Sequence, residues 1–363
     1  MSDTISETKN KGYGESRRSF LGKFATASLA VPLLPTTLVG GQQISPPRNK
    51  MIPTMTGPVP TDKLGTMLVH EHVLWGPIPD EARERSVEIA VGYLQEATRV
   101  GIDSLACLSP DRDIKLYAQI AERSPVRIVV STGTYLYSRS KSEHQQMSEQ
   151  QLFERIIRET TEGIDGTKLR AGIIKVAASK SPFTDWEKAA FRATGRAQRE
   201  TGAPVATHAV FAPREQFDLL VASGADPRRC FFSHVENKVG WAGRNLEQQA
   251  DYLVAIAKEG GSHLFNNFGL IHHTAWSDLV FMIQRLCDRG CMDKVLISID
   301  LAWEWIKGEP VIQHADRYPE IQPRTYSHMI TDVVPALLKA GFSAQDVRTF
   351  LVDNPRKFFE GNP

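Results

Sequence analysis

The chain has 363 residues, of which 41% are hydrophobic and 23% are charged, as in an ordinary globular protein of one large or two smaller domains. Its 43 Lys and Arg residues balance 42 Asp and Glu residues, which argues against a dedicated nucleic-acid binder and a polybasic membrane-surface protein. Four cysteines are too few for a disulfide-built scaffold, and no apolar run predicts a membrane-spanning helix.

Residues 1–45 are expected to form an export signal and a linker. Ser16–Lys23 contains two adjacent arginines followed by Phe and Leu, and a mildly apolar stretch covers 24–39. This order is typical of a twin-arginine signal, which would direct the protein to the periplasm. The alternative is a basic tail before a short apolar helix. Residues 42–61 are rich in Pro, Thr and Gly and are interpreted as a leader linker. The catalytic domain is expected to cover 46–363.

From Lys63 onward, strand-like and helical segments alternate. The predicted strands cover 66–69, 102–108, 127–130, 171–177, 204–208, 229–234, 262–265 and 294–299. Periodic apolar residues predict helices over 86–100, 114–122, 149–161, 185–200, 213–223, 246–259 and 276–289, and a further one at about 325–340. Eight such units predict a (β/α)8 TIM barrel. An open doubly wound sheet is the runner-up, but its Gly-x-Gly-x-x-Gly signature is absent.

Side chains that can bind metal ions lie at the predicted ends of several strands, where the active site of a barrel is found. They are His70, His72, Lys175, His208, His234 and Asp300. Residues i and i+2 of a strand share a face, so the first two histidines can bind one ion together. Imidazoles and a carboxylate suit Zn²⁺ or a similar ion. Each residue alone has an ordinary structural explanation, but their joint occurrence at strand ends favours a metal site.

Lys175 is the most unusual member of this set. It stands inside an apolar run with no paired charge in the local sequence, and lysine is rarely buried without a partner. The alternative is a lysine that extends from the strand end to solvent.

Seven motifs follow one another along the chain, namely Leu68–His72, Gly133–Tyr137, Gly172–Ala177, Pro204–His208, Ser233–His234, Ile299–Asp300 and Asp353–Phe359. In their order and spacing, these motifs resemble the phosphotriesterase family of the amidohydrolase superfamily. The resemblance extends over residues 63–359, which is essentially the whole predicted barrel.

The resemblance implies a binuclear metal centre. His70, His72 and Asp300 would hold the more buried ion, and His208 and His234 the more exposed one. Lys175 would bridge both as an N-carboxylate formed with CO₂. The expected ions are Zn²⁺, with Mn²⁺, Co²⁺ or Fe²⁺ as alternatives. A metal-bridging hydroxide would attack the substrate, and Asp300 would accept the proton. The resemblance also implies a homodimer.

Two asparagines depart from the family pattern. Asn267 stands where the lactonase branch has an arginine and the phosphotriesterase branch a histidine, and Asn237 stands where the latter has an acidic residue of a proton relay. Because an amide cannot relay a proton at neutral pH, we expect Asp300 to release its proton directly to solvent.

Aromatic residues bear on the substrate. Tyr135 favours the lactonase or esterase side, in which a tyrosine reaches towards the metal-bound oxygen, although it is equally compatible with a core position. Trp303, with Trp75, Trp305 and Phe268, is predicted either to line an apolar leaving-group pocket or to cover the barrel rim. His272 and His273, after the seventh strand, are interpreted as lying outside the metal site, with a position at the border of the pocket as the alternative.

The sequence therefore predicts a hydrolase of lactones or carboxylic esters, with organophosphate triesters as the alternative substrates. The Gly-x-Ser-x-Gly motif of serine hydrolases and the His-Glu-x-x-His motif of zincins are both absent. A non-catalytic periplasmic metal-binding protein is the alternative from a different class. The partner is expected to be a small molecule, not nucleic acid, and no stable membrane span is expected after signal removal.

Overall fold

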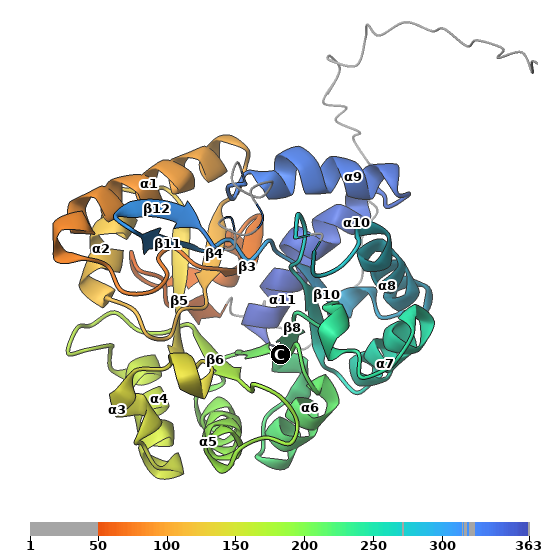
Figure 1. Ribbon diagram of the computed structural model, residues 1–363, viewed down its shortest axis with the longest axis horizontal. Helices are drawn as coiled ribbons and strands as arrows, with labels where there is room; N and C mark the ends of the chain where they lie inside the picture. The colour runs from red at the N-terminus through yellow and green to blue at the C-terminus, as the bar shows by residue number, and fades with distance from the viewer. Residues whose placement is uncertain (1–49, 271, 314, 316–317, 319–323, 362–363) are drawn as a thin grey trace, which may run out of the picture. The chain divides into compact units, whose positions relative to one another are not determined.

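Eight parallel strands form one sheet in the part of the chain that the computed structural model describes, residues 50–270, 272–313, 315, 318 and 324–361. The predicted export signal lies outside these residues. The strand order is β10-β9-β8-β7-β6-β5-β4-β3 (Figure 1). Their bounds are Met67–Glu71 (β3), Ser104–Cys107 (β4), Arg127–Gly133 (β5), Ile173–Ala177 (β6), Val205–His208 (β7), Cys230–Ser233 (β8), Ser262–Phe265 (β9) and Val295–Ile297 (β10).

The sheet closes where its first and last strands meet. The backbone N–H of His72, directly after β3, donates to the carbonyl oxygen of Leu301, which follows β10, at 2.9 Å. The N–H of His70 donates to the hydroxyl oxygen of Ser298 at 3.1 Å. These bonds and the parallel order confirm the predicted (β/α)8 TIM barrel.

Helices surround the barrel (Figure 1). Their bounds are Arg83–Arg99 (α1), Ile114–Glu122 (α2), Ser142–Gln145 (α3), Glu149–Thr161 (α4), Asp185–Thr201 (α5), Pro213–Ala222 (α6), Leu246–Lys258 (α7), Trp276–Asp288 (α8), Val334–Lys339 (α9), Ala344–Arg348 (α10) and Asn354–Glu360 (α11). Capping boxes at Ser148, Thr184 and Asn245 set the starts of α4, α5 and α7. None of the helices in the described part of the chain is both long and apolar enough to cross a lipid bilayer.

The barrel interior has two layers. Towards the N-terminal ends of the strands, every strand contributes buried apolar side chains, namely Met67, Val69, Ala106, Val129, Ile173, Ala206, Phe231, Leu264 and Leu296. Residues two positions further along a strand face the same way. These positions include Lys175, His208 and Ser298, so the interior becomes polar where the strands end.

Residues from both ends of the domain seal the apolar layer. Ile52 is 2% exposed and packs in the same cluster as Phe358 and Phe359 of α11. Ile52 lies in β1 (Met51–Ile52), which pairs with β2 (Val59–Pro60) in a small antiparallel sheet. The interpretation of residues 42–61 as a linker is therefore wrong for residues 50–61. This segment forms β1 and β2, and it buries the side chain of Ile52 in the apolar layer of the barrel.

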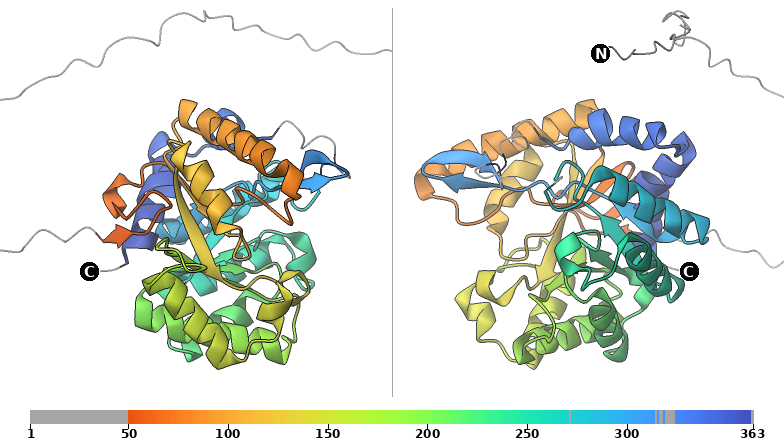
Figure 2. Two further views of the ribbon diagram at one scale, coloured as in Figure 1. Left: turned by 90° about the vertical axis from the view of Figure 1, so that its left-hand side faces the viewer. Right: turned by 45° about the vertical axis from the view of Figure 1, so that its right-hand side comes forward.

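A hairpin that the sequence did not predict follows β10. It consists of β11 (Trp303–Ile306) and β12 (Glu309–Ile312) and lies beside α1 (Figure 2). The indole N–H of Trp305 donates to Ser86 at 2.8 Å, and Arg85 pairs with Glu309 at 3.1 Å. In place of the single helix predicted at 325–340, a π-helix over Met329–Val333 continues into α9.

We expect Gly133→Ala to destabilise the barrel at the strand that carries Lys175. Gly133 has φ of +96°, and a Cβ atom there would lie 2.0 Å from the backbone oxygen of Lys175. Gly166→Ala is the matched control, because Gly166 also has a positive φ, +75°, but open space around it. Gly133→Ala should cost at least about 2 kcal/mol more than the control in urea unfolding. Equal losses of unfolding free energy in the two variants would show that the close approach of Gly133 to the backbone of Lys175 does not affect stability.

Candidate metal centre

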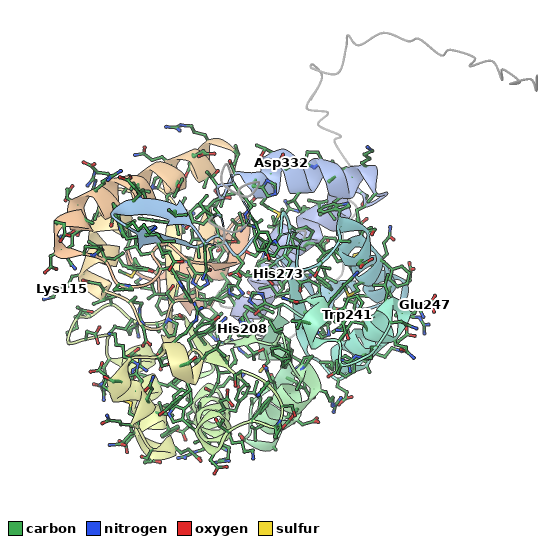
Figure 3. The ribbon with its side chains drawn as sticks, in the orientation of Figure 1. Lys115, His208, Trp241, Glu247, His273 and Asp332 are labelled. Atoms are coloured by element: carbon green, nitrogen blue, oxygen red, sulfur yellow. The ribbon has the colours of Figure 1, made fainter. Side chains whose placement is uncertain are left out.

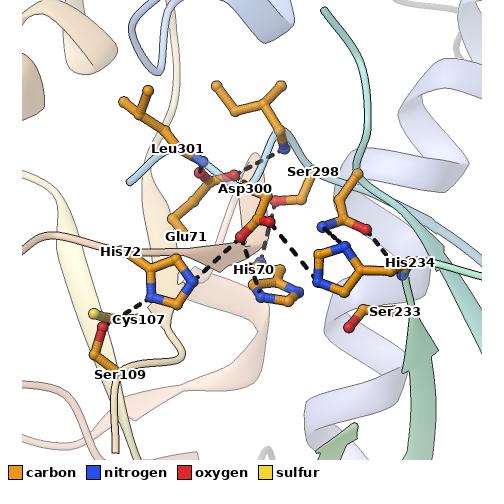
Figure 4. Close-up of polar contacts among 12 residues, drawn as sticks. His70, Glu71, His72, Cys107, Ser109, Ser233, His234, Ser298, Asp300 and Leu301 are labelled. Carbon is orange, nitrogen blue, oxygen red and sulfur yellow. Dashed lines mark hydrogen bonds and ion pairs between the residues drawn. The ribbon is translucent and has the colours of Figure 1, made fainter. Parts of the chain in front are cut away.

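The side chains of His70, His72, His234 and Asp300 converge at the C-terminal end of the barrel (Figure 4). The Nε2 atoms of His70 and His72 lie 3.3 and 3.2 Å from Oδ1 of Asp300. Nε2 of His234 lies 3.7 Å from the other carboxylate oxygen. His70, His234 and Asp300 offer ligand atoms that all lie within 4.8 Å of one another, which is close enough to share a metal ion.

Lys175 and His208 complete the predicted set. The ring of His208 lies 4.3 Å from that of His234 and 5.3 Å from that of Tyr135, measured between centroids. Nζ of Lys175 lies 6.0 Å from the centre of the Tyr135 ring. His208 lies near the middle of the ring of helices in Figure 3, whereas Lys115 and Glu247 lie at its edge. The six residues predicted as ligands therefore come together at one place.

Burial keeps the imidazoles neutral. It lowers the pKa of His234 to about 4 and, together with nearby positive groups, holds the pKa values of His70 and His208 well below their usual range. Burial alone would raise the pKa of Asp300, but the surrounding imidazoles outweigh it and hold that pKa well below the usual value. Neutral imidazoles and an ionised carboxylate are the protonation states that bind a metal ion.

The surroundings of Lys175 show whether the residues present fit a centre of two divalent ions. Its side chain is fully buried, and Nζ has no hydrogen-bond partner among the described residues. Burial lowers the pKa of Lys175 to about 7, so a large share of the amine is uncharged at neutral pH. A buried unpartnered ammonium is costly, whereas an uncharged amine can react with CO₂ to give a carboxylate ligand. The residues present thus fit a two-ion centre.

Two of the ligands sit on strained backbone. Asp300 has φ of +51° and His234 has φ of +63°, both in the left-handed region that residues other than glycine rarely occupy. Such conformations persist where neighbouring groups hold them, and they concentrate at functional sites.

Glu71 holds the backbone on both sides of Asp300. Its fully buried carboxylate accepts hydrogen bonds from the N–H groups of Ile299 and Leu301, at 3.0 and 2.7 Å, and from the Ser298 hydroxyl at 2.6 Å. Burial raises the pKa of Glu71 to about 8. Because both oxygens accept from backbone N–H groups, the geometry favours the ionised form in spite of burial.

Glu236 holds the loop after β9 in a similar way. The Glu236 carboxylate accepts from the N–H groups of Asn266 and Asn267, both at 2.8 Å. Asn266 in turn accepts from the backbone N–H of His234 at 3.1 Å, and its amide nitrogen lies 3.1 Å from Nδ1 of that ring. Ser109 orients His72 in the same way, with Oγ 2.8 Å from Nδ1. These partners turn the ligand rings towards the centre.

A cavity of about 230 Å³ opens above the ligands. The described residues that line it include Tyr135, Arg139, His208, His234, Asn237, Asn267, His273, Asp300, Gln313 and Arg324. Tyr135 and Asn267 therefore border the candidate substrate space, as predicted from their positions. Burial raises the pKa of Tyr135 above its usual value, so its hydroxyl remains a neutral hydrogen-bond donor.

Other expectations need correction. Trp303 is only 1% exposed, and its ring packs in the apolar core at 6.4 Å from the rings of Tyr93 and Trp305. This position argues against the predicted contact with substrate. His273, by contrast, borders the cavity, which is the alternative position that its place after the seventh strand allowed.

Sequence reasoning also missed several residues. In the sequence, Glu71 directly follows the candidate ligand His70, and Glu236 stands two residues after the candidate ligand His234. A buried acid next to a ligand was the available signal, since Glu is rarely fully buried without partners. Arg324 gave no comparable signal. It donates to the carbonyl oxygens of Phe268 and Ile299, at 2.8 and 2.9 Å, and so joins the ends of β9 and β10.

Comparison with known proteins agrees with this arrangement. The model of the phosphotriesterase family matches residues 50–359. The chain belongs to this family. The family match covers all six predicted ligands, from His70 to Asp300.

Individual relatives of the chain share about a quarter of its sequence. The phosphotriesterase homology protein of Mycobacterium tuberculosis is 28% identical over 85% of this chain and 97% of its own length. Human N-acetyltaurine hydrolase is 27% identical, over 74% of this chain and 72% of its own length. Among solved structures, a mutant PTE-like lactonase from Deinococcus radiodurans matches with a TM-score of 0.74 and 27% identity, covering 85% of this chain and 99% of that one.

We expect Glu71→Gln to loosen the loop that carries Asp300. The variant keeps the side-chain size but replaces one accepting oxygen with an amide group that cannot accept from backbone. Urea unfolding of the metal-free protein should show a loss of about 1–3 kcal/mol. Metal content after dialysis should also fall, because the released N–H groups flank a ligand.

Glu236→Gln is the control for this prediction. Both N–H groups of the adjacent loop donate to Oε1 of Glu236, so Glu236→Gln can keep these bonds while it makes the same substitution at a buried acid. We expect a smaller loss of stability and better metal retention than in Glu71→Gln. Equal metal loss in both variants would contradict a specific role for Glu71 at Asp300.

Proposed function

We propose that this metal-dependent hydrolase acts on the carbonyl group of lactones or carboxylic esters. The observation that carries the proposal is the position of Tyr135. Its ring lies against His208 and Trp75, at 5.3 and 5.4 Å, and borders the cavity above the ligands. A neutral phenol there can donate a hydrogen bond to an oxygen of a bound ester. Similarity to a PTE-like lactonase supports the same choice. Organophosphate triesters are the alternative substrates, supported by the family itself.

Each ligand has a distinct role in this proposal. His70, His72 and Asp300 would hold one ion, His208 and His234 the other, and carboxylated Lys175 would lie between them. Zn²⁺ is the expected ion. Bound divalent ions would polarise the scissile group and lower the pKa of a water molecule. Glu71 and Asn266 keep Asp300 and His234 in the positions that this arrangement requires.

Asp300 is the proposed proton acceptor. Its side chain is 19% exposed and borders the cavity, in contrast to the nearly buried rings of His70 and His72. Asn237 and Asn267 border the same cavity but cannot carry a proton at neutral pH. We therefore propose that Asp300 passes its proton directly to solvent in the cavity.

Substrate class can be tested with purified protein reconstituted with Zn²⁺, Mn²⁺ or Co²⁺. We expect kcat/KM to be higher for lactones and aryl esters than for an aryl dialkyl phosphate. Preference for the phosphate triester would favour the alternative function. Two bound ions per chain with no turnover of any substrate would instead support a non-catalytic metal-binding protein.

Lys175→Met tests the bridging role of the lysine. The variant keeps a side chain of similar length but cannot form a carboxylate with CO₂. We expect metal content to fall below two ions per chain and kcat to fall by at least about 10³-fold, because both ions lose a shared ligand. Lys50→Met is the control, since Lys50 is also partly buried but bonds to the carbonyl oxygen of Gly202 at 2.9 Å. Its metal content should not change.

Bicarbonate provides a second test of Lys175. Metal-free protein should recover activity faster when Zn²⁺ is added with bicarbonate than in CO₂-free buffer. Identical recovery in both buffers would argue that the amine itself, not a carboxylate, is present in the active enzyme.

We also propose that the twin-arginine segment exports the protein. Replacing Arg17 and Arg18 together by lysine keeps the charge but removes the arginine pair. We expect the full-length protein to remain in the cytoplasm, as measured by immunoblotting of cell fractions. Lys23→Arg is the control and should be exported normally. Export of the double variant at the normal level would contradict the proposal.

A further inference from the structure

The cavity above the metal ligands is more positive than a neutral ester requires. Among the described residues that line it, Arg139 and Arg324 are the cationic side chains and Asp300 is the acidic one. Asp300 is already a predicted metal ligand, and two divalent ions would add further positive charge. Arg324 is buried and donates to two backbone carbonyls. Arg139 is exposed and has no such structural engagement.

Arg139 stands at the junction of two cavities. The cavity above the ligands shares Tyr135 and Arg139 with a second one of about 310 Å³. Trp75, Ser109 and Pro110 are among the residues that line the second cavity. A substrate whose scissile bond lies at the metal centre can therefore extend past Tyr135 to reach the guanidinium group of Arg139.

No carboxylate of a described residue lies within 4 Å of this guanidinium. The acidic residues at the second cavity are Asp111 and Glu304. Asp111 is engaged, because it lies 2.6 Å from Nδ1 of His144 and accepts from the N–H of Lys141 at 2.9 Å. Glu304 borders the second cavity only, beside Gly76. Arg139 thus faces the substrate space without an internal counter-ion.

The turn that carries Arg139 is firmly held. The side-chain amide of Gln145 donates to the carbonyl oxygens of Tyr137 and Ser140, at 2.7 and 3.0 Å. The Tyr137 ring packs edge-on against Trp186 at 5.2 Å. A cation on a fixed turn loses less conformational entropy on binding than one on a loose loop, which is the usual arrangement for recognition.

We propose that Arg139 binds an anionic oxygen group, a carboxylate or a sulfonate, that the substrate carries beyond its scissile bond. The natural substrate is then an anionic lactone or ester. A guanidinium group suits this task because its N–H donors match two oxygens of such a group at once. This inference rests on the proposed function, since it names the substrate class of the same site.

Three aryl acetates test the inference, namely methyl 4-acetoxybenzoate, 4-acetoxybenzoate and 4-acetoxybenzenesulfonate. They share one scissile bond and differ in the charge at the far end of the ring. We expect Arg139→Gln to lower kcat/KM for the anionic esters by about 10- to 100-fold, mainly through KM, and to change the neutral ester by less than about threefold. Arg139→Lys should restore part of the loss because it retains the charge.

Glu304→Gln is the matched control. It changes the charge at the second cavity by one unit, without touching Arg139. If the effect of Arg139 is a direct contact, Glu304→Gln should leave the preference for the anionic esters nearly unchanged. If Glu304→Gln instead raises the preference for the anionic esters by as much as Arg139→Gln lowers it, the effect of Arg139 is general electrostatic attraction. That result would overturn the proposed direct contact.

The remaining outcomes separate the inference from the proposed function. Equal effects of Arg139→Gln on the neutral and anionic esters, or no effect on either, would overturn the inference and leave the ester hydrolase intact. Hydrolysis of none of the three esters by metal-loaded wild-type protein would overturn the proposed function and the inference with it. Selective loss on one anionic ester would support Arg139 and identify that group as the preferred one.

Discussion

The Glu71 carboxylate links the first strand of the barrel to the loop after the last one, and the metal centre depends on this link. A carboxylate ligand after β10 must turn back towards β3, which places Asp300 in a left-handed conformation that costs free energy. Glu71 offsets that cost because its bonds to Ile299 and Leu301 lie on either side of the strained residue. The same carboxylate therefore helps to close the sheet and positions a ligand.

The layered interior explains why such a polar cluster can exist inside the barrel. An apolar layer below it excludes water from the N-terminal end, and the ligand layer above it is buried but opens into a cavity. Burial lowers the pKa values of His234 and Lys175, so the imidazole is neutral and a large share of the amine is uncharged before any ion binds. Much of the desolvation of these side chains is thus completed during folding. An incoming metal ion meets imidazoles that are already neutral and a carboxylate that is already ionised.

The barrel and the convergence of the candidate ligands were predictable because both follow from local patterns. Apolar runs identify the eight strands, and histidines at strand ends mark one edge of any parallel sheet. The supporting residues were harder to find, because their role depends on contacts across the chain. Glu71 and Ser298 are 227 positions apart, yet they are hydrogen-bonded at 2.6 Å. No spacing rule predicts that pair from one sequence.

Errors arose where tertiary packing overrides composition. Pro-rich and Thr-rich residues before the barrel resembled a linker, but one buried isoleucine makes part of them structural. Trp303 resembled a pocket aromatic because it follows Asp300, yet the hairpin turns its ring into the core. In both cases the residue type fitted two environments, and only the neighbouring elements decide between them.

The apolar layer also makes the candidate metal centre depend on two segments that are distant from it in the sequence. Its members come from both extremes of the described domain, Ile52 near the start and Phe358 and Phe359 near the end. A chain without α11 would lack Phe358 and Phe359 in this layer, and a chain without β1 would lack Ile52. Loss of either segment would therefore weaken the layer that supports the candidate ligands, although neither segment contains a ligand.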